Sequence, residues 1–131
     1  MKDIIKKFMP SFQQDIISEN EDAYRSELDD LEEQIHLIPD KEQSTTVHAH
    51  FFYAGCDWFI LSWNRDDDIL YCYAILNCDV EMSELGYTLL SDLKEHGRIE
   101  LDFYWEKKSL AQAKYDKYPE YFPEPKENEI I

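Results

Sequence analysis

The sequence predicts an α+β fold, in which a four-stranded, mostly antiparallel sheet has helices packed on one face and an acidic N-terminal helix precedes it. Two observations support this prediction. Several segments between residues 44 and 105 alternate apolar with polar side chains or are apolar throughout, which is typical of strands. A segment before them repeats apolar residues at steps of three and four, which is typical of a helix.

The length and composition indicate one cytoplasmic domain. The 131 residues fit the usual size of a domain, and a share of 44% hydrophobic and 15% aromatic residues is enough to build a core. Three cysteines without a Cys-x-x-Cys pair indicate a reducing compartment, and we expect neither a signal peptide nor a membrane span. We divide the single domain 1–131 into an acidic helical region at 1–43, an α+β core at 44–115 and an extended tail, rich in proline, aromatic and acidic residues, at 116–131.

The charge of the chain is strongly negative, since 13 basic and 29 acidic residues give 13 − 29 = −16. Such a charge repels nucleic-acid phosphate and anionic membranes, so we expect neither as a direct partner. A partner that is recruited electrostatically has a basic protein surface. The alternative, that the acidity only maintains solubility, stays open.

The N-terminal region predicts three helices. Pro10 suits the start of a second short helix, and Ser18 with Glu21 is typical of a capping box before a third. The third helix carries a narrow apolar stripe, and the rest of its surface is acidic. This acidic face is either simply solvated or a row of carboxylates that resembles phosphates, while the stripe would permit a homodimer through the helix at 24–38. The stripe consists of Tyr24, Leu28, Leu31, Ile35 and Ile38.

Three predicted strands follow, at residues 44–53, 58–64 and 69–78. The connections between them are short, so neighbouring strands are expected to be antiparallel. The third segment is apolar on both sides, which favours a central position in the sheet.

A turn, a short helix and a fourth strand complete the predicted core. Gly86 marks a turn into the helix, and Gly97 ends it. Residues 99–105 alternate apolar and polar side chains, so one face belongs to the core and the other is exposed to solvent. Ser109 then starts a last helix. Four aromatic residues are expected to lie mainly in or beside one core with Leu89 and Leu93: Trp58, Trp63, Phe103 and Trp105.

A series of motifs runs through about residues 47–110. It consists of Phe51 and Phe52, Trp58 and Trp63, Tyr71 and Tyr73, Glu81, Glu84-Leu85-Gly86-Tyr87, Leu89 to Leu93, Ile99 to Trp105, and Ser109 and Leu110. This order resembles a family of uncharacterised bacterial domains that are carried on plasmids, conjugative elements and phages. The resemblance implies an α+β fold and brings no assigned active site. The acidic helix before the first strand departs from the family pattern as an insertion.

Candidates for catalysis or metal binding are few. His48 and His50 share a strand face, and Asp57 could approach across the hairpin as a third metal ligand. Cys56 could pair with His50 as a nucleophile, but no orienting group or oxyanion element is visible. The sequence contains no phosphate-binding loop and no nucleophile elbow. We therefore expect no enzyme, no cofactor and no metal, and a small enzyme or metal protein that uses His48 and His50 stays open as an alternative.

The favoured function is a non-catalytic, acidic protein-binding module. We expect an inhibitor, encoded by a mobile element, that mimics nucleic acid and blocks a host nuclease or a defence complex such as restriction or CRISPR. An immunity or adaptor protein that neutralises a basic toxin is the alternative. The exposed sheet face is expected to combine His48, His50 and Glu106 with some of the partner-binding residues. The predicted partner-binding residues are Glu27, Asp29, Asp30, Glu32, Glu33, Asp66, Asp67, Asp68, Glu100, Asp102 and Tyr104.

Overall fold

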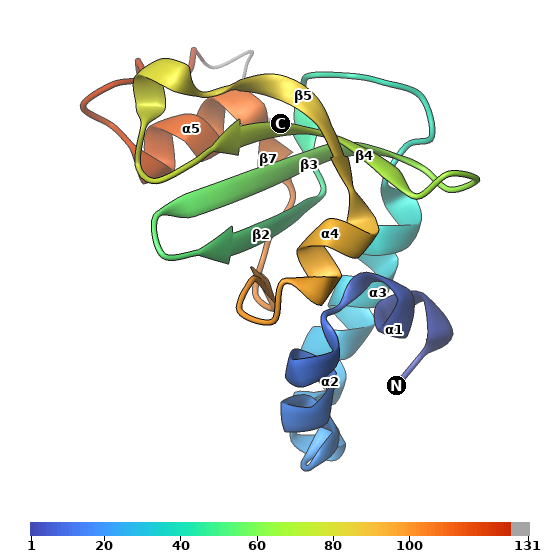
Figure 1. Ribbon diagram of the computed structural model, residues 1–131. Coiled ribbons are helices and arrows are strands. Elements are labelled where there is room, and N and C mark those ends of the chain that lie inside the picture. Colours follow the sequence, from blue (N-terminus) through green and yellow to red (C-terminus); the bar gives the residue numbers. More distant parts are fainter. Residues whose placement is uncertain (127–131) are drawn as a thin grey trace.

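The computed structural model describes residues 1–126 and has the predicted α+β architecture (Figure 1). Its main sheet has five antiparallel strands in the order β5-β4-β3-β2-β6, one strand more than predicted, and a small second sheet pairs β1 with β7. The helices are α1 (Asp3–Phe8), α2 (Ser11–Ser18), η1 (Glu21–Tyr24), α3 (Arg25–Leu37), η2 (Val80–Met82), α4 (Leu90–Glu95) and α5 (Leu110–Lys117), where η marks a 3₁₀ helix. The strands are β1 (Thr46–Val47), β2 (Ala49–Tyr53), β3 (Cys56–Asn64), β4 (Ile69–Ile75), β5 (Glu84–Leu89), β6 (Glu100–Leu101) and β7 (Lys108–Ser109).

Strands β3 and β4 lie at the centre of the sheet because apolar side chains occupy both of their faces. In β3, Ile60 and Trp63 contribute to one core, while Phe59 and Leu61 contribute to a second core. A β-bulge in β3 shifts the register against β4, which places these large side chains on the two faces without strict alternation. The sheet therefore needs cover on both faces.

Helices α1 to α4 cover the first face, and the apolar stripe of α3 packs into that core (Figure 1). Trp63 is only 1% exposed, and its ring contacts Phe8 edge-on with centroids 5.1 Å apart. Leu28, Leu31 and Ile35 of the stripe are buried. Since the stripe packs inside its own chain, it is not a free surface, and a homodimer through this helix would have to use the acidic side.

Helix α5 covers the opposite face, so the prediction that helices pack on one face only is wrong. Leu110 and Ala113 of α5 pack with Phe59 and Ile75 of the sheet, and the ring of Trp105 closes this second core. The side chain of Ser109 accepts a hydrogen bond from the backbone of the first turn, which is why α5 begins where the sequence predicts.

The segment around Gly86 is an edge strand and not the predicted turn. Residues of β5 pair with β4 from Ala74 opposite Glu84 to Ile69 opposite Leu89. Helix α4 begins only after this strand, so Leu89 is 45% exposed and does not face inward, whereas the next leucine, Leu90, is buried.

The predicted strand at 99–105 is reduced to the two residues of β6. The side-chain amide of Gln13 takes the place of a further strand: its nitrogen donates to the carbonyl of Leu101 at 2.7 Å, and its oxygen accepts from the amide of Leu101 at 2.9 Å. The carboxylate of Asp102 then accepts a hydrogen bond from the amide of Tyr104 at 3.1 Å, which turns the chain away from the sheet. Glu100, Asp102 and Tyr104 therefore do not form one row on a sheet face.

Both ends of the chain depart in detail from the prediction. Helix α2 begins after Pro10, as expected, but it runs through Ser18, and α3 starts only at Arg25, so the predicted capping box is absent. The predicted tail is helical as far as Lys117, and its last residues, 127–131, lie outside the described residues. Within residues 1–126, no helix is both long enough and apolar enough to cross a bilayer.

Candidate functional site

A groove between α3 and the loop after β6 brings acidic and aromatic side chains together. Its volume is about 440 Å³. Glu27, Asp30 and Glu33 line it from α3, while Tyr104 and Glu106 line it from the loop. Tyr104 is 68% exposed, so its ring is available for contact. Four of these five residues are predicted partner-binding residues, and the groove unites them. We call this feature the acidic groove.

The remaining predicted acids of α3 lie elsewhere on the helix. Asp29 and Glu32 line a different hollow, together with Met1, Lys2 and Arg25. Glu21 lines this hollow too and pairs with the amino terminus, so three positive groups lie among three carboxylates on that side. In the acidic groove, by contrast, one lysine lies among four carboxylates, and none of these four forms an ion pair within residues 1–126. The carboxylates of the acidic groove thus have fewer positive groups among them than the carboxylates of the other hollow.

The inner part of the acidic groove offers apolar rings and one open acceptor. Phe103 lies edge-on to Tyr24 at a centroid distance of 5.5 Å and edge-on to Tyr104 at 5.4 Å. The side-chain oxygen of Gln34 is buried and accepts no hydrogen bond from the part of the chain that the structure describes. A hydrogen-bond donor that enters the groove would find this acceptor together with the carboxylates.

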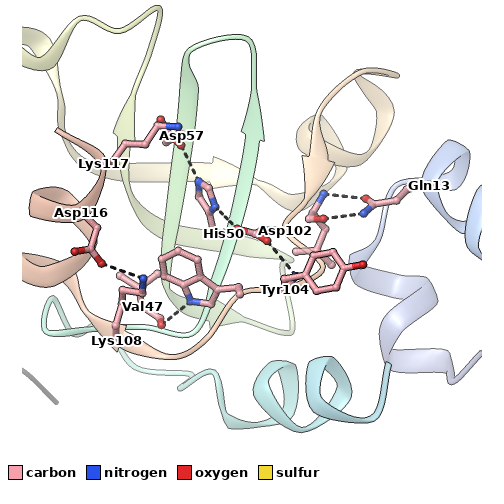
Figure 2. A network of polar contacts seen from close by, with 11 residues as sticks. Gln13, Val47, His50, Asp57, Asp102, Tyr104, Lys108, Asp116 and Lys117 are labelled. Atoms are coloured by element: carbon pink, nitrogen blue, oxygen red, sulfur yellow. Dashed lines mark hydrogen bonds and ion pairs between the residues drawn. The ribbon is translucent and has the colours of Figure 1, made fainter. Parts of the chain in front are cut away.

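The loop wall of the acidic groove is held in place by a buried polar network, drawn in Figure 2. The imidazole of His50 points its Nδ1 at Asp102 Oδ2, 2.9 Å away, and its Nε2 at Asp57 Oδ1, 2.8 Å away. In the register of the β2–β3 hairpin, Asp57 of β3 lies opposite Phe52, so it is the diagonal neighbour of His50 on β2. The imidazolium form of His50 satisfies both contacts, because both of its nitrogens donate and ionised carboxylates accept.

The pKa values of this pair follow from burial and charge. Burial alone lowers the pKa of His50, but the hydrogen bonds and charges of Asp102 and Asp57 outweigh it, so the pKa is raised. Burial alone raises the pKa of Asp102, but the hydrogen bond and charge of His50 and the amide of Tyr104 outweigh it, so this pKa is lowered. Both shifts favour the charged pair.

The far end of the network reaches α5. Asp57 is fully buried, and Lys117 Nζ lies 3.7 Å from its Oδ1 (Figure 2). The indole of Trp105 donates to the carbonyl of Val47 at 3.1 Å, which anchors the other end of the loop. These contacts tie β2, β3, the loop and α5 to one another, and they indicate a structural role for the network.

The hydrogen bonds of His50 bear on the catalytic and metal-binding roles that the sequence leaves open for it. Both nitrogens of His50 are engaged by carboxylates, so neither is free to activate Cys56 or to bind a metal with His48. The sulfur of Cys56 accepts a hydrogen bond from the amide of Asn77 at 3.3 Å. His48 is half-buried, and burial lowers its pKa. Over residues 1–126, no three or more His, Cys, Asp or Glu side chains are grouped to hold a metal ion.

The other predicted partner-binding residues are not part of the acidic groove. Asp66, Asp67 and Asp68 form the hairpin loop between β3 and β4. The carboxylate of Asp68 accepts from the indole of Trp63 at 3.0 Å, so it is partly engaged in structure. Glu100 is exposed on β6, and Asp102 is turned inward onto His50. The expected position of His50 on an exposed sheet face is therefore wrong, because Trp105 and α5 cover that face.

Sequence reasoning overlooked Gln34. It placed Phe103 and Trp105 in or beside one core; they pack against two different cores, and the groove that both also line was not predicted. No local signal marks these residues, because the groove exists only once the loop after β6 folds back on α3. One signal was available for the acids: Glu27 and Asp30 are three residues apart, as are Asp30 and Glu33, so they share one side of a helix.

Comparisons with models of protein families, with curated proteins and with solved structures find no match. The resemblance to a family of bacterial mobile-element domains therefore stays a prediction.

Proposed function

We propose that the chain is a non-catalytic, acidic protein-binding module, and that the acidic groove holds a basic segment of its partner. One observation carries the proposal: four carboxylates and an exposed tyrosine surround a groove that a single lysine lines. Carboxylates attract a basic surface and speed association, while an aromatic ring supplies contact area and a face for a lysine or arginine side chain.

The partner that this surface fits best is a nuclease or another nucleic-acid-binding protein. Glu27, Asp30 and Glu33 follow one another at about 4.5 Å along the helix axis, since each residue rises about 1.5 Å. One strand of DNA carries a charge about every 3.4 Å, a spacing of similar size. The module would then inhibit a host nuclease or defence complex by occupying its nucleic-acid site. The alternative of an immunity or adaptor protein uses the same groove against a toxin, and the identity of the partner separates the two.

A charge-reversal experiment tests the groove. Glu27, Asp30 and Glu33 are changed together to lysine, and the wild type and the variant are used as baits in lysate of the native host, followed by quantitative mass spectrometry. The captured protein is then purified for kinetic binding measurements and for nuclease assays. We expect the variant to lose most of the association rate, and the wild-type rate to fall as salt is raised.

A matched control removes the effect of net charge. Changing Glu19, Asp29 and Glu32 to lysine alters the charge by the same amount, from −16 to −16 + 6 = −10, but on residues outside the acidic groove. We expect this control to bind at close to the wild-type rate. Equal loss in both variants would assign the effect to overall charge, and undiminished binding by the groove variant would overturn the proposal.

A further inference from the structure

The outer edge of β5 is a second surface that the acidic groove does not explain. β5 is the last strand of the main sheet and pairs on one side with β4 (Figure 1). On its other side, residues 84–88 make no backbone hydrogen bond with any residue in 1–126. Such a row of open amides and carbonyls is a template for another strand.

Edge strands are usually protected, and β5 is not. Lysine, proline, a bulge or a covering segment commonly prevents an edge from pairing with another chain. β5 contains neither lysine nor proline, and its register against β4 runs without a bulge. Three of its side chains are apolar, point to the same face and are well exposed: Leu85 at 40%, Tyr87 at 65% and Leu89 at 45%.

The exposed apolar side chains of β5 lie beside tyrosines of the neighbouring strand, β4. Tyr87 lies opposite Tyr71 of β4, with ring centroids 5.3 Å apart, and Leu85 lies opposite Tyr73. The hydroxyl of Tyr87 donates to Glu42, which fixes the ring while leaving it exposed. An added strand would therefore find open backbone groups and an apolar platform for every second side chain.

Charge identifies the kind of strand that fits. Glu81 and Glu84 stand at the start of β5. The loop with Asp66 and Asp67 stands at its end, where the backbone carbonyl of Asp68 accepts a hydrogen bond from the amide of Leu90 at 3.0 Å. A second copy of the chain would bring another charge of −16 against this edge. We propose that β5 takes an extended segment of a protein partner as a sixth strand, with apolar residues at alternate positions and lysine or arginine at both ends.

The test uses the full chain and a small panel of synthetic peptides. Each has valine, isoleucine or tyrosine at alternate positions and lysine or arginine at both ends. Binding is measured by titration, and hydrogen exchange of the β5 amides is followed by NMR. We expect the amides of β5 that point away from β4 to become protected. Two methylated peptides are compared, each with methyl groups on the backbone nitrogens of one edge. Methylation of the edge that faces β5 is expected to weaken binding by about tenfold or more, and methylation of the other edge is expected to leave binding unchanged.

Protein variants distinguish this edge from the acidic groove. Leu85→Lys with Tyr87→Lys is expected to abolish peptide binding, while Tyr121→Lys, at a tyrosine that is 62% exposed elsewhere, leaves it unchanged. The groove variant with lysine at 27, 30 and 33 is also expected to bind the peptide normally. Loss of peptide binding therefore tests the β5 edge, and loss of partner binding by the groove variant tests the proposed function. No protection by any peptide at millimolar concentration overturns the proposal. A dimer of the wild type in sedimentation that the variant at 85 and 87 does not form would also overturn the proposal. The edge of β5 would then be occupied by a second copy of the chain.

Discussion

The imidazole of His50 lies 2.9 Å from the carboxylate of Asp102, and this contact joins the sheet to the loop that carries Tyr104. Asp102 thus serves two partners at once: one oxygen accepts from His50, and the other accepts from the amide of Tyr104. One wall of the acidic groove therefore depends on the charge state of a buried histidine, although neither residue of the pair lines the groove.

The first prediction concerns stability against pH. The pKa of His50 is raised in the folded protein, so its contribution is complete below the unfolded value of 6.5 and is lost as pH rises through the folded value. The pKa of Asp102 is lowered, so its contribution is complete above the unfolded value of 3.8 and is lost as pH falls through the folded value. We expect the pair to stabilise the fold most between these two limits, measured as the free energy of unfolding in urea.

A histidine variant isolates this effect from the other charges. His50→Gln keeps a hydrogen-bond donor and cannot titrate, so its unfolding free energy should change less between about pH 6 and about pH 9 than that of the wild type. His36→Gln, at an exposed histidine, should follow the wild-type curve. Parallel curves for the wild type and His50→Gln would show that His50 does not contribute to the pH dependence.

The second prediction concerns Gln13, which stands in for a missing strand. Gln13→Met keeps the approximate volume but leaves the amide and the carbonyl of Leu101 without their partner in a buried position. An unsatisfied buried backbone group costs about 1–3 kcal/mol, so we expect a loss of at least about 2 kcal/mol in unfolding free energy. Gln112→Met is the control, because its amide bonds Asp116 on the exposed surface of α5. A loss that is no larger than in the control would contradict the role of Gln13.

The contrast between β4 and β6 explains how much of the fold could be predicted. Ile69–Ile75 reads as a central strand because its own side chains are apolar on both sides, and the structure confirms this. Residues 99–105 alternate equally well, but the strand ends after Leu101, where Asp102 accepts from the amide of Tyr104 and turns the chain. Gln13, 88 residues earlier, bonds the outer edge of this short strand. A local pattern contains no information about such a distant contact.

The same limit applies to the candidate site. The acids of α3 could be recognised from composition, but the sequence alone could not tell that Asp29 and Glu32 share a hollow with the amino terminus. It also could not tell that Asp102, which alternates outward in the pattern, is turned inward by its bond to His50. Long-range packing decides which carboxylates remain available, and the pattern shows only where carboxylates are.

The third prediction compares two aromatic residues that the sequence places in one core. Trp63 is 1% exposed, so Trp63→Ala is expected to cost about 3–5 kcal/mol of unfolding free energy. Phe103 is only partly buried and packs on the rim of the first core, so Phe103→Ala is expected to cost about 1–2 kcal/mol. Chemical denaturation of both variants measures the difference, and equal losses would place Phe103 in the core after all.

The last prediction separates the tyrosine of the acidic groove from its carboxylates. Carboxylates act at a distance and chiefly change the association rate, whereas a ring in contact with the partner chiefly changes the dissociation rate. Tyr104 is 68% exposed, so Tyr104→Ala is expected to leave the unfolding free energy within about 0.5 kcal/mol of the wild type. If its ring contacts the partner, dissociation should become about tenfold faster, which corresponds to about 1.4 kcal/mol, with little change in association.

Tyr121→Ala is the matched control, since Tyr121 has a similar exposure of 62% and does not line the acidic groove. Both variants remove one exposed phenol and leave the net charge at −16, so electrostatic attraction is the same in both. Tyr104→Phe separates the ring from its hydroxyl. If the area and the face of the ring make the contact, this variant should retain most of the residence time on the partner. If the hydroxyl makes the contact, the residence time should fall as in Tyr104→Ala. Equal dissociation rates for Tyr104→Ala, Tyr121→Ala and the wild type would remove Tyr104 from the binding surface and leave binding to the other residues that line the acidic groove.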